Sequence, residues 1–264
     1  MTDPAKNPLF RFPGLKPAAW LFFIFLYLPI VVLLALAFND NEQATIWTGF
    51  STRWFGIVLD NADLIRAFKN SLIVATTATL LATVIATLAA LGMNRARFRG
   101  QDGVNALISL PLIVPEIVTA VATLLFFIML GFRLGLGTVI LAHTVFCIPF
   151  AYLPIRARLE GMDPRLEEAA QDLYANRRQT FLRVVLPQLW PGIISGAMLA
   201  FIISLDDFVI TYFVAGAGAT TLPIYIFGMI RIGISPEVNA VSALMLAISI
   251  VFVAASWLVG RVRR

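Results

Sequence analysis

Long apolar stretches with almost no charge constrain the fold of this chain more than any other feature of its sequence. Six of them are long enough to cross a membrane: Ala18–Phe38, Ser71–Met93, Gly103–Phe132, Leu134–Ile155, Val184–Leu205 and Val238–Gly260. An α-helix rises about 1.5 Å per residue, so about 20 residues cross the hydrocarbon core of a bilayer. Within lipid, only helices and closed barrels satisfy all their backbone hydrogen bonds. The sequence therefore predicts an all-α, polytopic membrane protein with six transmembrane helices.

The overall composition agrees with a lipid environment. Of the 264 residues, 59% are hydrophobic and 13% are charged, whereas a soluble domain carries about 25% charged residues. The net charge of +5 could suggest a nucleic-acid partner, but the Lys and Arg residues cluster in short segments between the apolar stretches. This distribution is typical of membrane topology. We therefore expect a lipid bilayer around the chain and no nucleic-acid partner.

The basic residues also predict the orientation of the chain. Fifteen of the 20 Lys and Arg residues fall in the N-terminal segment, the second and fourth loops and the C-terminal tail. Cytoplasmic loops carry an excess of Lys and Arg, so both termini are predicted to be cytoplasmic. The first apolar stretch could instead be a signal peptide, since Ala35-Leu36-Ala37 resembles a cleavage site. Because the stretch is longer than a typical signal core, we expect it to remain as a span.

A further uncharged stretch, Phe208–Ile230, contains Gly216-Ala217-Gly218 and Pro223. Glycine and proline punctuate regular structure, so this stretch should break into two pieces that are each too short to span. We expect a loop or a partly re-entrant segment outside the fifth helix, lodged against protein.

The fourth loop, Arg156–Pro187, is far longer than a helix connection requires. Asp163 followed by Pro164 predicts an N-cap and the first residue of a helix. Asn176 is a candidate for a left-handed turn, and a second short helix is predicted over Arg178–Leu186, ended by the proline that follows. Two interpretations of this helix–turn–helix remain open, a solvated amphipathic linker and a docking surface for a cytoplasmic partner.

This loop carries a recognisable pattern. Glu168-Ala169-Ala170 and, after the expected gap, Leu186-Pro187 resemble the EAA loop of ABC importer permeases. Two positions differ from that family, because Tyr174 stands where glycine is usual and Val184 where isoleucine is usual. The resemblance implies that the loop docks onto an ATPase. The implied contact residues are Glu168, Ala169, Ala170, Asn176, Arg177, Arg178 and Phe181.

Later segments extend the resemblance. Ser204–Ile210, Gly218–Pro223 and Ser235–Ala240 look like the spermidine/putrescine permease group, and its second permease subunit in particular. The resemblance implies a type I ABC importer fold, with residues 1–264 as one transmembrane permease domain and 156–187 as its coupling loop. It also implies a bacterial inner-membrane location, a sister permease, two copies of a cytoplasmic ATPase and a periplasmic binding protein.

The sequence offers little for catalysis. It contains no P-loop motif and no cluster of catalytic or metal-binding residues, so we expect no enzyme activity and no cofactor on this chain, with ATP and Mg²⁺ bound by the partner ATPase. The single histidine, His143, and the single cysteine, Cys147, both lie in an apolar stretch. A lone histidine cannot build a metal site, so a satisfied interior side chain is expected.

Other functions remain possible at this point. An ion-driven carrier or an integral-membrane enzyme is one alternative, although a carrier normally shows paired internal halves and no repeat relates the first three spans to the last three. An ABC permease for an opine, an amino acid, a phosphonate or ferric iron is another. Capture selectivity lies largely in a binding protein, so the sequence does not separate putrescine from spermidine.

Three carboxylates lie in or near the spans, and each needs a reason because a charge at a helix centre costs about 2.5–3.5 kcal/mol on insertion scales. Glu116 follows Pro115 in the middle of the third stretch, where the helix should bend. Asp206 and Asp207 lie at the outer end of the fifth. They could instead cap helix ends or pair with Arg231.

Small and polar residues share one face of the fifth helix. This stripe comprises Gly196, Ala200, Ser204, Asp207 and Thr211, and we expect it to line a narrow cavity. We hypothesise that Asp207 and Glu116 offer weak anionic stations to a di- or triamine and that Ser204 adds a hydrogen bond. Asp206, about 100° away, could hold the loop or the sister subunit. Trp54, in the outer loop, could add a cation–π contact or serve as an interface anchor.

Overall fold

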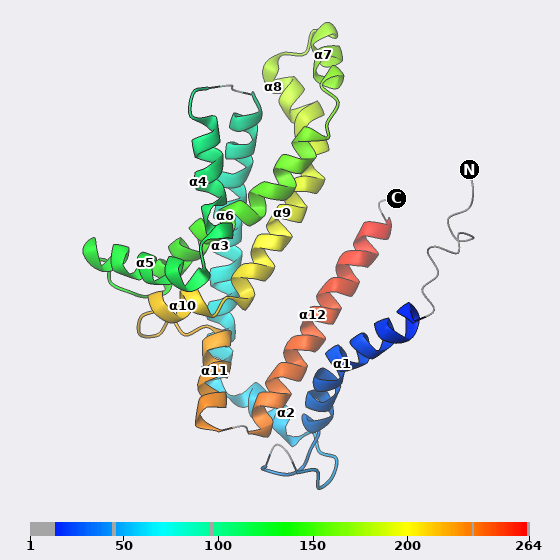
Figure 1. Cartoon of the computed structure of the whole chain (residues 1–264), viewed down its shortest axis with the longest axis vertical. Coiled ribbons are helices and arrows are strands. Elements are labelled where there is room, and N and C mark those ends of the chain that lie inside the picture. Colours follow the sequence, from blue (N-terminus) through cyan, green and yellow to red (C-terminus); the bar gives the residue numbers. More distant parts are fainter. Residues whose placement is uncertain (1–13, 44–45, 96–97, 234, 263–264) are drawn as a thin grey trace. The chain divides into compact units, whose positions relative to one another are not determined.

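The computed structural model describes residues 14–43, 46–95, 98–233 and 235–262, and nearly all of them are helical (Figure 1). The helices are α1 (Leu15–Leu36), α2 (Arg53–Asp60), α3 (Ala62–Arg95), α4 (Gln101–Ile113), α5 (Glu116–Met129), α6 (Leu136–Glu160), α7 (Arg165–Asp172), α8 (Arg177–Thr180), α9 (Leu186–Asp206), α10 (Val209–Val214), α11 (Leu222–Ile232) and α12 (Pro236–Val262). A π-helical turn, Phe181–Val185, joins α8 to α9. The predicted all-α class is confirmed.

The long helices fall where the apolar stretches predicted spans. Four helical segments are long and apolar enough to cross a membrane: α1, the α3 helix, α6 and the continuous run Arg177–Asp206 that ends with α9. The pair of α4 and α5 makes a fifth if its two bent halves count as one span. Within α12, Pro236–Ile248 is a shorter apolar stretch. The chain is thus a polytopic membrane protein, and the exact number of six spans stays a prediction.

The third apolar stretch is broken rather than straight. The axes of α4 and α5 differ by 109°, and the break falls at Val114 and Pro115, which both have extended backbone angles. Proline forces the residue before it out of the helical region, which explains the position of the break. The expected bend is therefore confirmed. Glu116, however, is the first residue of α5 rather than a residue in the middle of a continuous helix.

The uncharged stretch after α9 forms two short helices, α10 and α11, as predicted. The loop between them is held against the rest of its unit. The Asn70 side chain donates hydrogen bonds to two carbonyl groups of this loop, and the Ser71 hydroxyl accepts one from the N–H of Leu222 at the start of α11. A Cβ atom on Gly216 would lie 1.9 Å from the carbonyl oxygen of Leu134. Only glycine therefore fits there.

The helices α6 and α9 pack side by side over most of their length (Figure 1). Their contact is close because the facing residues are small: a Cβ atom on Gly196 would lie 2.5 Å from the carbonyl oxygen of Ala151. The buried alanines Ala82, Ala86 and Ala90 of α3 join the same core. Small residues at every fourth position let membrane helices approach closely, so this packing follows directly from the sequence pattern.

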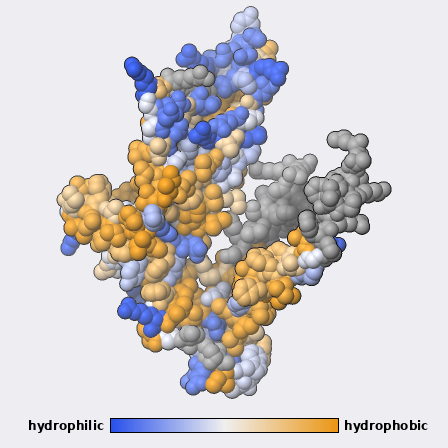
Figure 2. Space-filling model, in the orientation of Figure 1, coloured by the Kyte–Doolittle hydropathy of each residue, from blue (hydrophilic) through white to orange (hydrophobic). Residues whose placement is uncertain are grey.

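Contacts divide the chain into two compact units, Met1–Ala62 with Ile226–Arg264, and Asp63–Tyr225. In the first unit, α12 packs against α1 and α2. The second unit contains the helices from α3 to α10 and all the carboxylates of interest. Figure 2 shows hydrophilic residues over the end of the second unit that carries α7 and α8, and hydrophobic residues over its middle. The grouping concerns contacts within one chain, and a single permease domain stays a prediction.

Candidate functional site

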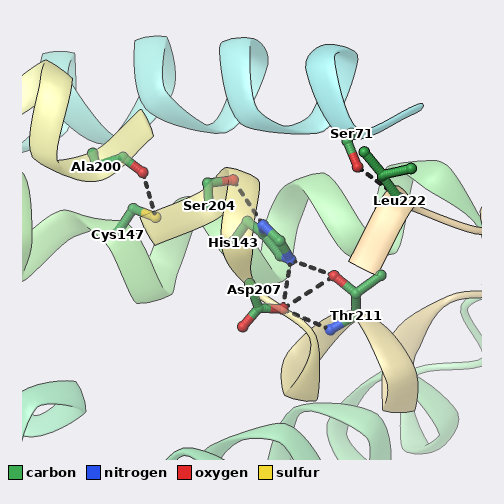
Figure 3. A network of polar contacts seen from close by, with 8 residues as sticks. All are labelled: Ser71, His143, Cys147, Ala200, Ser204, Asp207, Thr211 and Leu222. Carbon is green, nitrogen blue, oxygen red and sulfur yellow. Dashed lines mark hydrogen bonds and ion pairs between the residues drawn. The ribbon is translucent and has the colours of Figure 1, made fainter. Parts of the chain in front are cut away.

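A buried polar network lies where α9 ends (Figure 3). Asp207 follows the last residue of α9 and has an extended backbone, so the chain turns there into α10. Its Oδ1 atom accepts hydrogen bonds from the backbone N–H of Thr211, at 3.0 Å, and from the Thr211 hydroxyl, at 3.1 Å. The carboxylate thus satisfies an N–H group in the first turn of α10. This confirms the capping alternative for Asp207.

His143 of α6 completes this network. Its Nε2 atom lies 3.2 Å from Oδ1 of Asp207 and 2.8 Å from the Thr211 hydroxyl oxygen. Its Nδ1 atom lies 2.8 Å from the hydroxyl oxygen of Ser204. Both ring nitrogens therefore have partners in a fully buried position, which confirms the expected interior role of this histidine. Within its unit Asp207 thus pairs with His143, and the alternative pairing with Arg231 stays a prediction.

The second carboxylate oxygen of Asp207 has a different environment. Asp207 is 7% exposed, and its Oδ2 atom has no hydrogen-bond donor among the described residues. The exposed carboxyl group of Glu116, at the start of α5, lies within hydrogen-bonding range of the Asp207 carboxylate. The structure therefore brings together Glu116, Ser204 and Asp207. A buried acceptor without a donor among the described residues is costly to the fold, which makes this pair of carboxyl groups the candidate site for a cation.

Asp206 does not join this group. Asp206, the last residue of α9, is exposed. Trp54 belongs to the other unit, where its indole N–H donates a 2.8 Å hydrogen bond to the backbone oxygen of Asn39. The guanidinium group of Arg53 lies 4.5 Å from the centre of its ring. These contacts make Trp54 an anchor within its own unit, and a contact with substrate stays a prediction.

The polar stripe on α9 has another role than expected. Its members Gly196 and Ala200 are buried against α6. Ser204, also on α9, contacts His143 of α6. The stripe therefore packs helix against helix instead of lining a narrow cavity. The expectation of a cavity was wrong because small residues also permit close helix packing, and periodicity does not distinguish the two.

The predicted coupling loop forms α7, a tight turn and α8. The Asp163 carboxylate accepts a hydrogen bond from the Arg165 N–H at 3.0 Å, and Pro164 already has helical angles. The capping predicted for Asp163 is confirmed. Glu168 and Ala169 are exposed, and Ala170 is half-buried. The first short helix of the loop therefore presents its acidic and small residues at the surface.

The turn after α7 departs from the prediction. Tyr174, not Asn176, adopts the left-handed conformation, with φ of 61°. The N–H of Tyr174 bonds to the Gln171 carbonyl group and that of Ala175 to the Ala170 carbonyl group, which is the Schellman arrangement that normally requires glycine. The turn keeps these two bonds with a strained, left-handed backbone at Tyr174, and the tyrosine side chain is 97% exposed.

Asn176 instead caps the next helix. Its side chain accepts a hydrogen bond from the N–H of Gln179, whose side chain in turn bonds to the N–H of Asn176. This reciprocal pair is a capping box, so Asn176 was assigned to the wrong turn. The exposed Arg177 and Arg178 then open α8, and Phe181 is half-buried where α8 passes into the π-helical turn.

The second helix does not stop at Pro187 as predicted. It passes through the π-helical turn and continues into α9. The N–H of Leu186 bonds to the Phe181 carbonyl group, five residues earlier, and the Gln188 side chain donates to the Val184 carbonyl group. A π-turn adds one residue and loosens the helix, which lets it accept a proline without breaking. The second helix of the predicted coupling loop is therefore continuous with a membrane helix.

Comparison with known proteins places these features in a family. The family described as "Binding-protein-dependent transport system inner membrane component" matches residues 82–264. The chain belongs to this permease family.

Individual relatives show which permeases of this family the chain resembles. The permease is 36% identical to the spermidine/putrescine transport system permease protein PotC of Escherichia coli (strain K12), over 90% of each chain. It is 39% identical to the putrescine transport system permease protein PotI of the same strain, over 97% of this chain and 94% of that protein. The permease therefore belongs to the group that contains these polyamine permeases, and it is a transport subunit rather than an enzyme.

Solved structures agree on the fold. A bacterial ABC transporter involved in the import of the acidic polysaccharide alginate superposes with a TM-score of 0.70 at 16% identity, over 98% of the permease and 99% of that chain. The MetNI methionine ABC transporter superposes with a TM-score of 0.63 at 20% identity, over 73% and 92%. At these identities the likeness shows the ABC importer permease fold alone.

Sequence reasoning missed the part that His143 plays in the permease site. It treated His143 as an isolated interior residue, whereas Nε2 of His143 lies 3.2 Å from Oδ1 of Asp207. One signal was present, because His143, Cys147 and Ala151 follow at steps of four and so share one face of a helix. The sequence did not reveal that this face meets α9, since that pairing joins residues about sixty positions apart.

Proposed function

We propose that this permease subunit forms half of the translocation pathway of an ATP-driven importer for a di- or triamine, such as putrescine or spermidine. The single observation that carries this proposal is the unpartnered Oδ2 atom of buried Asp207, with Glu116 beside it. The polyamine permeases among its relatives support the same substrate class. ATP and Mg²⁺ bind to a partner ATPase, and this chain binds no cofactor.

The chemistry of the site suits a weakly held cation. A primary ammonium group donates up to three hydrogen bonds, and a charge-assisted bond to a carboxylate is stronger than a neutral one. Asp207 offers one free oxygen, because the other already accepts bonds from Thr211. Glu116 is exposed and offers a second station. A pathway needs sites weak enough to release the substrate. Two carboxylates that each bind the amine weakly meet that need.

Other residues have supporting places in this proposal. The Ser204 hydroxyl contacts His143, so a direct bond from Ser204 to the amine would compete with that contact. Asp206 is exposed on another side of α9, where it could meet the sister subunit or the incoming substrate. An opine, an amino acid, a phosphonate or ferric iron remains as alternative cargo. An ion-driven carrier is disfavoured by membership of the binding-protein-dependent family.

Uptake measurements test the substrate and the site together. Cells that carry the transporter should take up labelled putrescine or spermidine, and unlabelled amines should compete while opines, amino acids, phosphonates and ferric iron should not. Asp207→Asn and Glu116→Gln should each reduce uptake sharply at an unchanged membrane level. Asp206→Asn, a neighbouring acid outside the pair, should reduce uptake less than Asp207→Asn. Normal uptake by both amide variants of the pair would overturn the acidic pathway.

The assembly follows from the coupling loop. We propose that α7 and α8 dock onto one of two copies of a cytoplasmic ATPase, with a sister permease and a periplasmic binding protein completing the importer. The contact residues are Glu168, Ala169, Ala170, Asn176, Arg177, Arg178 and Phe181. Because α8 continues into α9, closure of the ATPase pair would move a membrane helix that ends at Asp207.

A bulky substitution tests this docking. Ala170→Trp should abolish ATP hydrolysis stimulated by the loaded binding protein, because a large side chain prevents close approach of the helix. Ala62→Trp, at an exposed position where α3 begins, is the control on the opposite side of the membrane. Stimulated hydrolysis at the normal rate in Ala170→Trp would remove the docking role.

The proposed topology has six spans, with α4 and α5 as one broken span, α12 as the sixth, and both termini in the cytoplasm. Its basis is the distribution of Lys and Arg along the chain. Reporter fusions at Asn41 and Arg99 should report opposite sides of a bacterial inner membrane. If both report the same side, the first two spans are wrongly assigned.

A further inference from the structure

The hydrogen bonds around Thr211 fix the proton of one histidine nitrogen. The Thr211 hydroxyl has one proton, and it lies 3.1 Å from Oδ1 of Asp207, an ionised oxygen that only accepts. This proton therefore points to Asp207. The Nε2 atom of His143, 2.8 Å from the same hydroxyl oxygen and 3.2 Å from Oδ1, must then donate. Nε2 carries a proton.

The contact with Ser204 determines the protonation state of the other ring nitrogen, Nδ1. In the described helices, several threonine hydroxyls donate to the carbonyl group four residues earlier, namely those of Thr77, Thr87, Thr123 and Thr144. The Ser204 hydroxyl makes no such bond; its recorded polar contact is Nδ1 of His143, at 2.8 Å. The carbonyl group of Ala200 is instead contacted by the Cys147 thiol. The buried Ser204 proton thus has Nδ1 as its acceptor.

We propose that His143 is a positioning residue for the cation pathway: a neutral imidazole, protonated on Nε2, that holds Asp207 through Oδ1 and leaves Oδ2 free for the ammonium group of the substrate. The inference rests on the proposed function. Contacts link Ser204 to His143, His143 to Thr211 and Thr211 to Asp207 (Figure 3), and with the protons assigned as above each bond is donated toward Asp207. The network ends on one carboxylate oxygen.

The neutral state is what makes this arrangement useful. A positively charged imidazole would form a buried ion pair with Asp207, and the carboxylate would then have no net charge to offer a cation. A neutral imidazole orients the carboxylate and leaves its negative charge in place. Removing His143 should therefore weaken the station without removing the carboxylate itself.

Nitrogen NMR of the assembled transporter tests the protonation state. His143 is the single histidine of this chain, and a spectrum of the His143→Gln complex identifies its signals by their loss. With ¹⁵N-labelled histidine we expect one protonated nitrogen, Nε2, and one unprotonated nitrogen, Nδ1. Two protonated nitrogens, or a proton on Nδ1 alone, would overturn the proposal.

A double-mutant cycle tests the positioning role. In proteoliposomes that contain the full transporter, His143→Leu should reduce putrescine uptake about ten- to hundredfold, the effect of losing a hydrogen bond to a charged group. His143→Gln, which keeps one donor and one acceptor, should restore most of it. The double variant with Asp207→Asn should be no worse than Asp207→Asn alone, since His143 acts through that carboxylate.

The outcomes separate the two proposals. Normal uptake by Asp207→Asn would remove the acidic station and with it the proposed function. Reduced uptake by Asp207→Asn together with normal uptake by His143→Leu would remove only the positioning role. Losses that multiply in the double variant would show that His143 merely supports the fold. If His143→Leu fails to assemble, failure of His143→Gln to transport would contradict the proposal.

Discussion

Substitution of Gly196 by alanine tests the packing that holds the site together. The added Cβ atom would lie 2.5 Å from the carbonyl oxygen of Ala151, whereas ordinary contacts begin at 3.4 Å. The backbones of α6 and α9 would therefore have to separate locally by about 0.9 Å. Overpacking of this kind costs about 1–3 kcal/mol. Alanine also favours helix over glycine by about 1 kcal/mol, so the net loss of stability should be about 0–2 kcal/mol.

Gly92 supplies the matched control, because it lies in α3 with nothing within 4 Å of an added Cβ atom. Gly92→Ala gains the helix preference without the clash and should raise the free energy of unfolding by about 1 kcal/mol. The two variants should thus differ by about 1–3 kcal/mol, the clash alone. Unfolding of the purified chain in mixed micelles, titrated with SDS, measures both. Equal gains in the two variants would refute close contact between α6 and α9 at Gly196.

Three further predictions concern the loops. Tyr174→Gly should raise stability by about 1–2 kcal/mol, because a left-handed L-residue is strained by that amount; hydrogen exchange at the N–H of Ala175 should slow, and faster exchange would contradict the strained turn. Gly216→Ala should give little folded permease in the membrane, because its Cβ atom would lie 1.9 Å from the Leu134 carbonyl oxygen; a normal level would show that the loop lies elsewhere. Asn70→Leu should make the loop after α10 more sensitive to protease, through loss of two hydrogen bonds, and unchanged cleavage would deny Asn70 that role.

Much of the membrane architecture could be predicted from the sequence, because apolar length and proline position act locally. The break before Glu116 followed from Pro115, and the start of α7 followed from Asp163. The prediction failed where a proline could be absorbed. Pro187 is accommodated by a π-helical turn, and no local pattern signalled that the helix would continue.

The candidate site was predictable in part. The cost of charge in a membrane pointed to Glu116, Asp206 and Asp207 from their positions in or near the apolar stretches, and the structure brings Glu116 and Asp207 together but leaves Asp206 exposed. Periodicity could place Ser204 and Asp207 on one face but could not say what that face meets. His143 contacts them across α6 and α9, and such long-range pairings arise from tertiary packing rather than from any local preference.

The turn after α7 shows another limit of prediction from the sequence. Glycine is expected at Tyr174, and its replacement suggested that the turn had moved to Asn176. The structure keeps the turn in place and strains the tyrosine instead. The two hydrogen bonds of the turn outweigh a left-handed penalty of about 1–2 kcal/mol, and a sequence pattern alone does not give that balance.

Reconstituted transport measures the central claim most directly. The assembled importer, in proteoliposomes with its binding protein outside and ATP inside, should accumulate labelled putrescine or spermidine only while ATP is hydrolysed. The same importer with Asp207→Asn should hydrolyse ATP but accumulate little amine, and Asp206→Asn should transport far better than Asp207→Asn. Full accumulation by the Asp207→Asn importer, or transport of a non-amine solute with no uptake of either amine, would contradict a cation pathway built around the free oxygen of Asp207.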